Sequence, residues 1–419
     1  MTPTIPDMIR VFGRIGLLSF GGPAAQIALM HKELVEDRPW LTEQQYLRAL
    51  SFCMLLPGPE AMQLATYAGW RQRGIIGGLI GGGLFVIPGA IVIAALALLY
   101  GLYGNLPAVQ ALFIGVQATV VIIVIEALIK VSRRALQGVV HVAVACLAFI
   151  ALFVFAVPFP VVIGIAAIVG ALTFAKDTDD TPAAGSLQLN RSALILCVGG
   201  LLWALPILAV WAWPAPFLTD ISLFFSKLAV VTFGGAYAVL AYMTQEVVTD
   251  FGWLTTAQMM DALGLAETTP GPLILVTQFV AMLAGLAQGG VGLALLAGGL
   301  TLWVTFVPCF IWIFAGAPLI DWLDGQPRLR GALAAITAAV VGVIANLSLW
   351  FATHVMFGTV ATYRTGPVQI ISPDLTSLQL MPVLLAFLAA ALLLWRKWSL
   401  LWVLAVCALS SLGLHLAMT

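Results

Sequence analysis

Residues 14–59 have the sequence RIGLLSFGGPAAQIALMHKELVEDRPWLTEQQYLRALSFCMLLPGP, and residues 227–272 repeat it without a gap as KLAVVTFGGAYAVLAYMTQEVVTDFGWLTTAQMMDALGLAETTPGP. The two stretches share a Phe-Gly-Gly triplet, a Trp-Leu-Thr triplet and a Pro-Gly-Pro triplet at the same spacing. Apolar composition alone does not place glycine, proline and tryptophan at matching positions. The chain is therefore built from two copies of one unit.

Composition sets the class of protein. Hydrophobic residues make up 62% of the chain and charged residues only 9%, whereas a soluble domain has about 25% charged residues. The lipid bilayer must therefore be the main solvent. The eighteen basic and eighteen acidic residues balance, so the sequence has no nucleic-acid footprint. The five cysteines show no metal-binding spacing, and neither a metal nor a cofactor is predicted.

Apolar segments long enough to cross a membrane follow each copy. Candidate spans lie near residues 75–100, 109–129, 139–157, 160–174 and 193–213 after the first copy, and near 291–316, 331–352, 375–395 and 398–417 after the second. Inside each copy the apolar pieces are shorter and are cut by Gly-Gly or Pro-Gly-Pro. Such segments predict broken or re-entrant helices, which a membrane tolerates only where they are buried in protein or line a cavity.

Basic residues predict the orientation, because cytoplasmic loops are enriched in them. With Lys130, Arg133 and Arg134 inside, the basic residues of the other loops also fall inside, and five crossings separate the two copies. An odd number of crossings inverts the second copy. We therefore expect an all-α polytopic membrane protein with two homologous inverted-topology repeats. Its expected parts are a first repeat at 1–174, a cytoplasmic linker at 175–192, a connecting transmembrane helix at 193–213 and a second repeat at 214–419.

The Gly-Gly breaks are the first candidate substrate site. A helix that restarts after a break presents free N–H groups and the positive end of its dipole, which together favour an anion. The alternative is a tight, glycine-mediated helix crossing. The candidate residues are Ser19, Phe20, Gly21 and Gly22 in the first copy and Thr232, Phe233, Gly234 and Gly235 in the second.

The Pro-Gly-Pro breaks are the second candidate substrate site. Two prolines around a glycine cannot continue a helix, and the second proline suits the start of the next one. A hydroxyl before the second break and an amide shortly after each break could donate hydrogen bonds to an oxyanion. The alternative is a structural kink. The candidates are Pro57, Gly58, Pro59 and Gln63, and Thr269, Pro270, Gly271, Pro272 and Gln278.

Few charged residues lie near these breaks. Arg14 and Lys227 occupy equivalent positions and could compensate an anion's charge, or could extend to the membrane interface. Carboxylates repel an oxyanion, so Glu33, Glu60 and Glu246 are candidates for pairing with cations or for carrying coupling protons. Glu60 could instead complement a helix dipole.

Other functional classes lack their signatures. The sequence contains no HExxH, GxSxG, Walker loop or acidic metal cluster, so an enzyme is not predicted. A lipid scramblase or lipid-processing membrane protein is the alternative from another class. It would need polar residues in a groove that faces lipid, whereas this sequence places its polar residues in the broken helices.

The two sets of motifs, with Gly69-Trp70-Arg71-Gln72-Arg73-Gly74 after the first, resemble the chromate ion transporter family in its long, two-domain form. The resemblance implies a plasma-membrane carrier of the bacterial inner membrane that exports chromate and confers chromate resistance, with sulfate as an analogue. A carrier of another oxyanion such as sulfate is an alternative substrate assignment, and a homodimer is an open alternative to a monomer. The second copy departs from the first at Ala236 for Pro23, Leu273 for Glu60 and Asp261 for Arg48, so we expect unequal halves.

Overall fold

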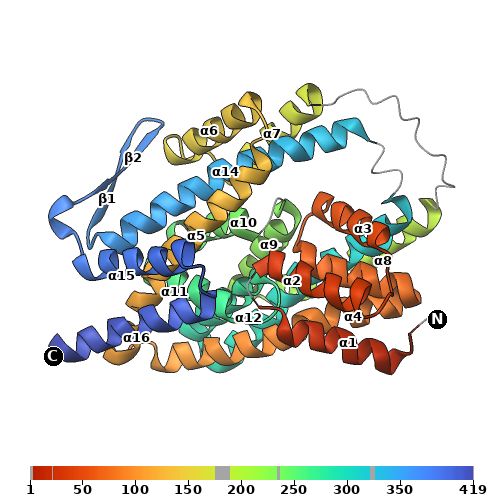
Figure 1. Ribbon diagram of the computed structural model, residues 1–419, viewed down its shortest axis with the longest axis horizontal. Coiled ribbons are helices and arrows are strands. Elements are labelled where there is room, and N and C mark those ends of the chain that lie inside the picture. The colour runs from red at the N-terminus through yellow and green to blue at the C-terminus, as the bar shows by residue number, and fades with distance from the viewer. Residues whose placement is uncertain (1–2, 21, 175–188, 234–235, 321–325, 419) are drawn as a thin grey trace. The chain divides into compact units, whose positions relative to one another are not determined.

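The computed structural model describes residues 3–20, 22–174, 189–233, 236–320 and 326–418. These residues are almost entirely helical (Figure 1). The first half contains α1 (Ile5–Leu18), α2 (Gly22–His31), α3 (Glu43–Leu55), α4 (Glu60–Tyr103), α5 (Pro107–Ala135), α6 (Val139–Phe153) and α7 (Phe159–Thr173). The second half contains α8 (Leu189–Ala212), α9 (Pro216–Val231), α10 (Ala236–Gln245), α11 (Thr256–Thr268), α12 (Val276–Gly316), α14 (Pro327–Met356), β1 (Val360–Thr365), β2 (Val368–Pro373), α15 (Leu380–Ala390) and α16 (Leu400–Met418).

Six of the described helices are long and apolar enough to cross a membrane, namely α4, α5, α8, α12, α14 and α16. Shorter apolar helices lie at Val139–Phe153, Phe159–Thr173 and Leu380–Trp395. The predicted class, an α-helical membrane protein with several crossings, is confirmed. The inverted relation of the two repeats stays a prediction.

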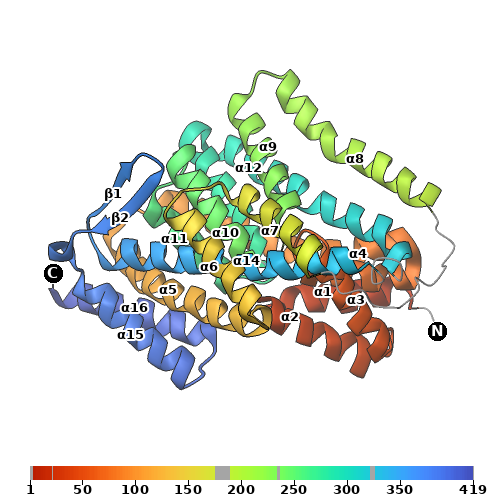
Figure 2. The ribbon, with the colours of Figure 1, turned by 90° about the horizontal axis from the view of Figure 1, so that it is seen from above.

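The chain divides into two compact units, and each draws on both halves of the sequence. Unit 1 comprises Met1–Leu98, Asp177–Ala236 and Leu265–Leu329, and unit 2 comprises Leu99–Lys176, Tyr237–Gly264 and Arg330–Thr419. Within unit 1, α12 packs against α8 and α9, and within unit 2, α5 packs against α15 and α16 (Figure 2). These units follow spatial contact, whereas the predicted boundaries at 174 and 214 follow the sequence duplication.

The first helix shows how the sequence sets a helix and its buried face. Thr4 and Asp7 form a capping box at the start of α1, which satisfies N–H groups that the helix itself leaves free. Met8, Phe12 and Ile15 recur every three or four residues and are fully buried. This spacing places them on one face, so α1 packs through that face within unit 1.

Two of the long helices are broken and fold back on themselves. In α4 the helix breaks at Arg73 and Gly74, where Gly74 has φ +59°, and in α12 it breaks at Gly289 and Gly290. A Cβ added at Gly69 would lie 2.1 Å from the carbonyl oxygen of Gly77, so the arms on either side of the break in α4 are in backbone contact. The arm before this break is too short to cross a membrane alone. These two breaks were not predicted, whereas the predicted Pro-Gly-Pro interruption of the first copy separates α3 from α4.

One segment is a β-hairpin in a region predicted to be all-α. Strands β1 and β2 pair antiparallel, and the following helix begins at Leu380 rather than near residue 375. The hairpin is rich in threonine, valine and isoleucine, which favour strands, and Gly366 at its turn has φ +61°. The backbone N–H of Gln369 donates to the Val154 carbonyl at 2.7 Å, which attaches the hairpin to unit 2.

Candidate functional site

The two Gly-Gly breaks begin in the same way. The hydroxyl of Ser19 donates to the Ile15 carbonyl at 2.6 Å, and the hydroxyl of Thr232 donates to the Leu228 carbonyl at 2.5 Å. Both hydroxyls thereby pair with a carbonyl one turn back at the end of their helices, α1 and α9. The predicted residues Gly21, Gly234 and Gly235 lie outside the described residues. The next helix, α2, begins at Gly22, which has φ +79°.

Main-chain hydrogen bonds connect the breaks crosswise. The N–H of Gly271 donates to the Ser19 carbonyl at 3.0 Å, and the N–H of Gly58 donates to the Thr232 carbonyl at 2.8 Å. The Pro-Gly-Pro turn of each copy thus contacts the Gly-Gly break of the other copy. All four residues belong to unit 1. The structure therefore brings together the two kinds of break that the sequence singles out.

Both turns need glycine for their conformation. Gly58 has φ +122° and Gly271 has φ +88°, a region that other residues rarely adopt. A Cβ added at Gly58 would lie 2.8 Å from the Cys309 sulfur and 2.9 Å from the Gln63 amide nitrogen. Glycine thus allows the turn to lie directly against α12 and the first arm of α4.

Three buried amides donate to main-chain carbonyls, two of them at the breaks and one in the second arm of α4. Gln63 donates to the Pro57 carbonyl at 2.7 Å, and Gln278 donates to the Ala90 carbonyl at 3.1 Å. The side-chain oxygens of both glutamines are buried, and neither has a hydrogen-bond partner among the described residues. The third amide, Gln26, was not predicted. It donates to the Gly271 carbonyl at 2.7 Å, and the signal was a polar residue in the middle of α2, whose other residues before His31 are apolar.

A small hollow lies beside the first break. It is lined by Gly22, Gln26, Ala266, Glu267, Thr269, Gly271 and Leu273. Its volume is about 10 Å³, which is room for about one water molecule. A tetrahedral dianion does not fit, so the structure is closed at this point. The buried Glu267 was also not predicted, because the first copy has Met54 at its place.

The predicted charged residues lie in four different places. Glu33 is buried between Arg14, whose Nε lies 3.4 Å from Glu33 Oε1, and Arg38, whose terminal nitrogen lies 2.5 Å from Oε2. Lys227 is exposed on α9. Glu60 begins the first arm of α4 in unit 1. Glu246 lies in unit 2 rather than with the other predicted residues. The carboxylate of Glu33 therefore joins two cations that are close in the sequence.

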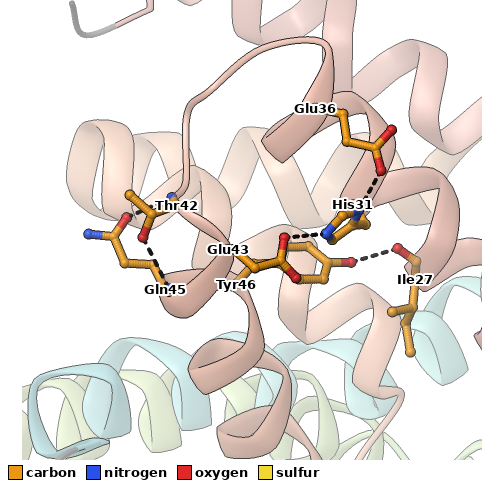
Figure 3. A network of polar contacts seen from close by, with 7 residues as sticks. All are labelled: Ile27, His31, Glu36, Thr42, Glu43, Gln45 and Tyr46. Carbon is orange, nitrogen blue, oxygen red and sulfur yellow. Dashed lines mark hydrogen bonds and ion pairs between the residues drawn. The ribbon is translucent and has the colours of Figure 1, made fainter.

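Polar contacts also tie α2 to α3 in the first copy (Figure 3). The ring nitrogens of His31 lie 3.0 Å from Glu36 Oε1 and 2.7 Å from Glu43 Oε2, and the Tyr46 hydroxyl donates to the Ile27 carbonyl. The hydrogen bond to Glu43 does most to raise the pKa of His31. The negative charge of Glu43 and the contact with Glu36 raise this pKa further. These contacts hold α2, which begins at the Gly-Gly break of the first copy, against α3.

Proteins of known name resemble this chain over most of its length. It is 30% identical to the chromate transport protein of Cupriavidus metallidurans, over 82% of this chain and 81% of that protein. It is also 30% identical to the chromate transport protein of Pseudomonas aeruginosa, over 81% of this chain and 79% of that protein. A probable chromate transport protein of Synechococcus elongatus is 28% identical, over 82% of this chain and 83% of that protein. No solved structure matches the chain significantly.

The family comparison covers both copies of the duplicated unit. The sequence model of the chromate transporters matches residues 6–171 and residues 219–412. These two matches contain every break described above, and together with the relatives they identify the chain as a transporter. The protein belongs to the chromate transporter family.

Proposed function

We propose that this protein carries chromate across the bacterial inner membrane and that net transport in the cell is outward. The observation that carries the proposal is the crosswise contact of Gly58 with Thr232 and of Gly271 with Ser19. It gathers four helix breaks in one unit of a chain whose relatives are named chromate transport proteins. Broken helices at matching places in two halves are typical of a transporter's substrate site.

The proposed binding groups are main-chain N–H donors and the amides around them. Helices that restart after a break direct N–H groups and positive dipole ends at a ligand. Glycines at the breaks let an anion approach the main chain closely. Gln63 and Gln278 supply further polar atoms, and Arg14 and Lys227 supply positive charge nearby. Every residue of the predicted binding set remains part of this proposal.

Transport requires the closed site to open. The hollow of about 10 Å³ beside Gly22 and Gly271 is too small for a tetrahedral dianion. The protein therefore has to adopt a second conformation, in which the breaks separate and the anion can bind. An inverted relation of the two repeats supplies such a pair of conformations, because one repeat can open to each side of the membrane. The matched hydroxyl contacts of Ser19 and Thr232 support this part of the proposal.

The membrane potential favours efflux. A dianion that leaves an inside-negative cell moves with the field, and one charge across 100 mV is worth about 2.3 kcal/mol, so two charges give roughly 4.6 kcal/mol. That energy sustains a gradient on the order of a thousandfold. Export of this kind would confer chromate resistance without another ion. Main-chain donors respond to charge and shape, so we expect sulfate to compete with chromate.

Purified protein in liposomes tests the proposal. We expect an imposed potential, negative on the side that chromate leaves, to accelerate chromate movement with no ion gradient present, and excess sulfate to inhibit it. Protein-free liposomes are the control for leakage. Chromate movement equal to that of the protein-free liposomes would refute chromate transport. Movement that ignores the potential would instead favour electroneutral exchange for another divalent anion.

A further inference from the structure

Asp261 is a buried carboxylate that the proposed substrate site does not use. It lies on α11 in unit 2, and its residue is only 5% exposed. The matching residue of the first copy, Arg48, is exposed on α3. The duplication therefore placed an acid in the second copy where the first has a base at the surface. A buried carboxylate in a membrane protein is costly unless it is paired or protonated.

Two neutral groups, and no cation, hold Asp261. The Tyr100 hydroxyl donates to Oδ2 at 2.6 Å, and the Gln117 amide donates to Oδ1 at 2.7 Å. Among the residues that the structure describes, no basic side chain forms an ion pair with it. Tyr100 comes from α4 and Gln117 from α5. Of the titratable side chains among the described residues, Tyr100 contacts Asp261 directly, and His354 on α14 lines the same hollow as Gln117.

These partners suit both protonation states of the carboxyl. A tyrosine hydroxyl can donate or accept, whereas a glutamine NH₂ only donates. When Asp261 is charged, both partners donate to it. When Oδ2 carries a proton, that O–H can donate to the Tyr100 oxygen while Gln117 continues to donate to Oδ1. A proton can therefore bind and leave without a change of neighbours.

The carboxyl also lies close to an open hollow, with the Gln117 side chain between them. An open hollow of about 480 Å³ in unit 2 is lined by Gln117, Met260 and His354 together with Gly358 and Gln379 at the base of the β-hairpin. Gln117 both lines this hollow and contacts Asp261. The Gln117 side chain thus lies between the carboxyl and the hollow. Because an amide does not relay a proton, exchange takes place when water from the hollow passes beside Gln117 and reaches the carboxyl.

We propose that Asp261 is a proton-binding site, filled from this hollow, whose occupancy controls the rate of chromate transport. The step transfers a proton from hydronium to Oδ2, leaves a water molecule, and removes one negative charge from unit 2. No other reactant takes part. Control of transport rests on the proposed function, whereas proton binding does not. If Asp261 only held the helices together, it would form the same hydrogen bonds, but its protonation would not change the rate of transport.

Two measurements on the full-length protein test the two parts separately. Infrared difference spectra across an acid–base titration report protonated carboxyls without any substrate. Chromate flux in liposomes across the same pH range reports control of transport. Asp261→Asn mimics the protonated state, and Asp261→Glu keeps an acid there if the asparagine variant does not fold. Glu126→Gln is the matched control in unit 2, because Glu126 is half-buried and paired with Lys130 at 2.7 Å.

We expect Asp261→Asn to lose a carboxyl band that wild type, Asp261→Glu and Glu126→Gln retain, and to flatten the pH profile of flux. Tyr100→Phe removes one donor to the charged form and should move the profile upward by about one pH unit. An unchanged band in Asp261→Asn overturns proton binding. Loss of the band with an unchanged flux profile overturns control of transport. If wild type carries no chromate but the band is lost, the proposed function fails and the proton site stands.

Discussion

The turn at Gly58 gives a sharp test of the crosswise contact between the two copies. Gly58→Ala adds a Cβ at φ +122°, 2.8 Å from the Cys309 sulfur and 2.9 Å from the Gln63 amide nitrogen. Backbone strain of this kind costs about 1–3 kcal/mol. The shift needed to relieve it would weaken the bond from the Gly58 N–H to the Thr232 carbonyl, worth about 0.5–1.5 kcal/mol. We therefore expect a loss of about 2–4 kcal/mol in folding stability.

Thermal unfolding in detergent and chromate flux in liposomes are the assays, with Gly299→Ala as the matched control. Gly299 lies in α12 with no atom within 4 Å of its added Cβ, so alanine there should be neutral or slightly stabilising. Gly271→Ala should lose less stability than Gly58→Ala and more than Gly299→Ala, because the atoms nearest to its added Cβ lie farther away, at 3.2 Å and 3.3 Å. If Gly58→Ala unfolds and transports like Gly299→Ala, the reasoning from the turn geometry is wrong.

Three further predictions concern charged groups, two in the first copy and one in the second. Glu33→Gln removes the carboxylate that Arg14 and Arg38 share and should lower the unfolding free energy by about 1–3 kcal/mol, and denaturant unfolding equal to wild type would contradict this. Because the folded-state pKa of His31 is raised, its stabilisation is present below the unfolded pKa of about 6.5 and is lost as pH rises through the folded value. The melting temperature of wild type relative to His31→Gln should therefore fall over that window, and a constant difference would exclude a charged His31. Lys227→Gln should reduce chromate flux several-fold at unchanged membrane insertion, whereas full activity would make Lys227 an interface anchor.

The sequence was sufficient to locate the breaks but not to connect them. Glycine and proline mark where a helix has to stop, and the duplication indicates which stops correspond. The partner of each break is a main-chain group of the distant copy, such as Ser19 for Gly271. Main-chain groups are the same in every residue, so sequence alone cannot assign these pairs. The all-α prediction also missed the β-hairpin at 360–373, which lies between the predicted spans at 331–352 and 375–395.

The sequence did not predict which polar groups surround the buried side chains. Glu33 was predicted either to pair with cations or to carry coupling protons, and the fold places two arginines beside it. The sequence shows Asp261 only as a difference from Arg48 of the first copy. It does not predict the hydrogen-bond partners Tyr100 and Gln117, because they come from other helices. Periodicity identifies the buried face of a helix, but not the polar groups that meet a residue there.

The crosswise bonds of Gly58 and Gly271 also bear on how the two copies exist as one molecule. A single copy on its own would leave the Gly58 N–H without the Thr232 carbonyl that now accepts its hydrogen bond, and an unpaired main-chain group in hydrocarbon costs several kcal/mol. Each copy thus completes the other's fold, and a single continuous chain guarantees that the two are made in equal amounts. That dependence frees positions away from the shared bonds, so one copy can keep a surface arginine at 48 while the other acquires an internal acid at 261.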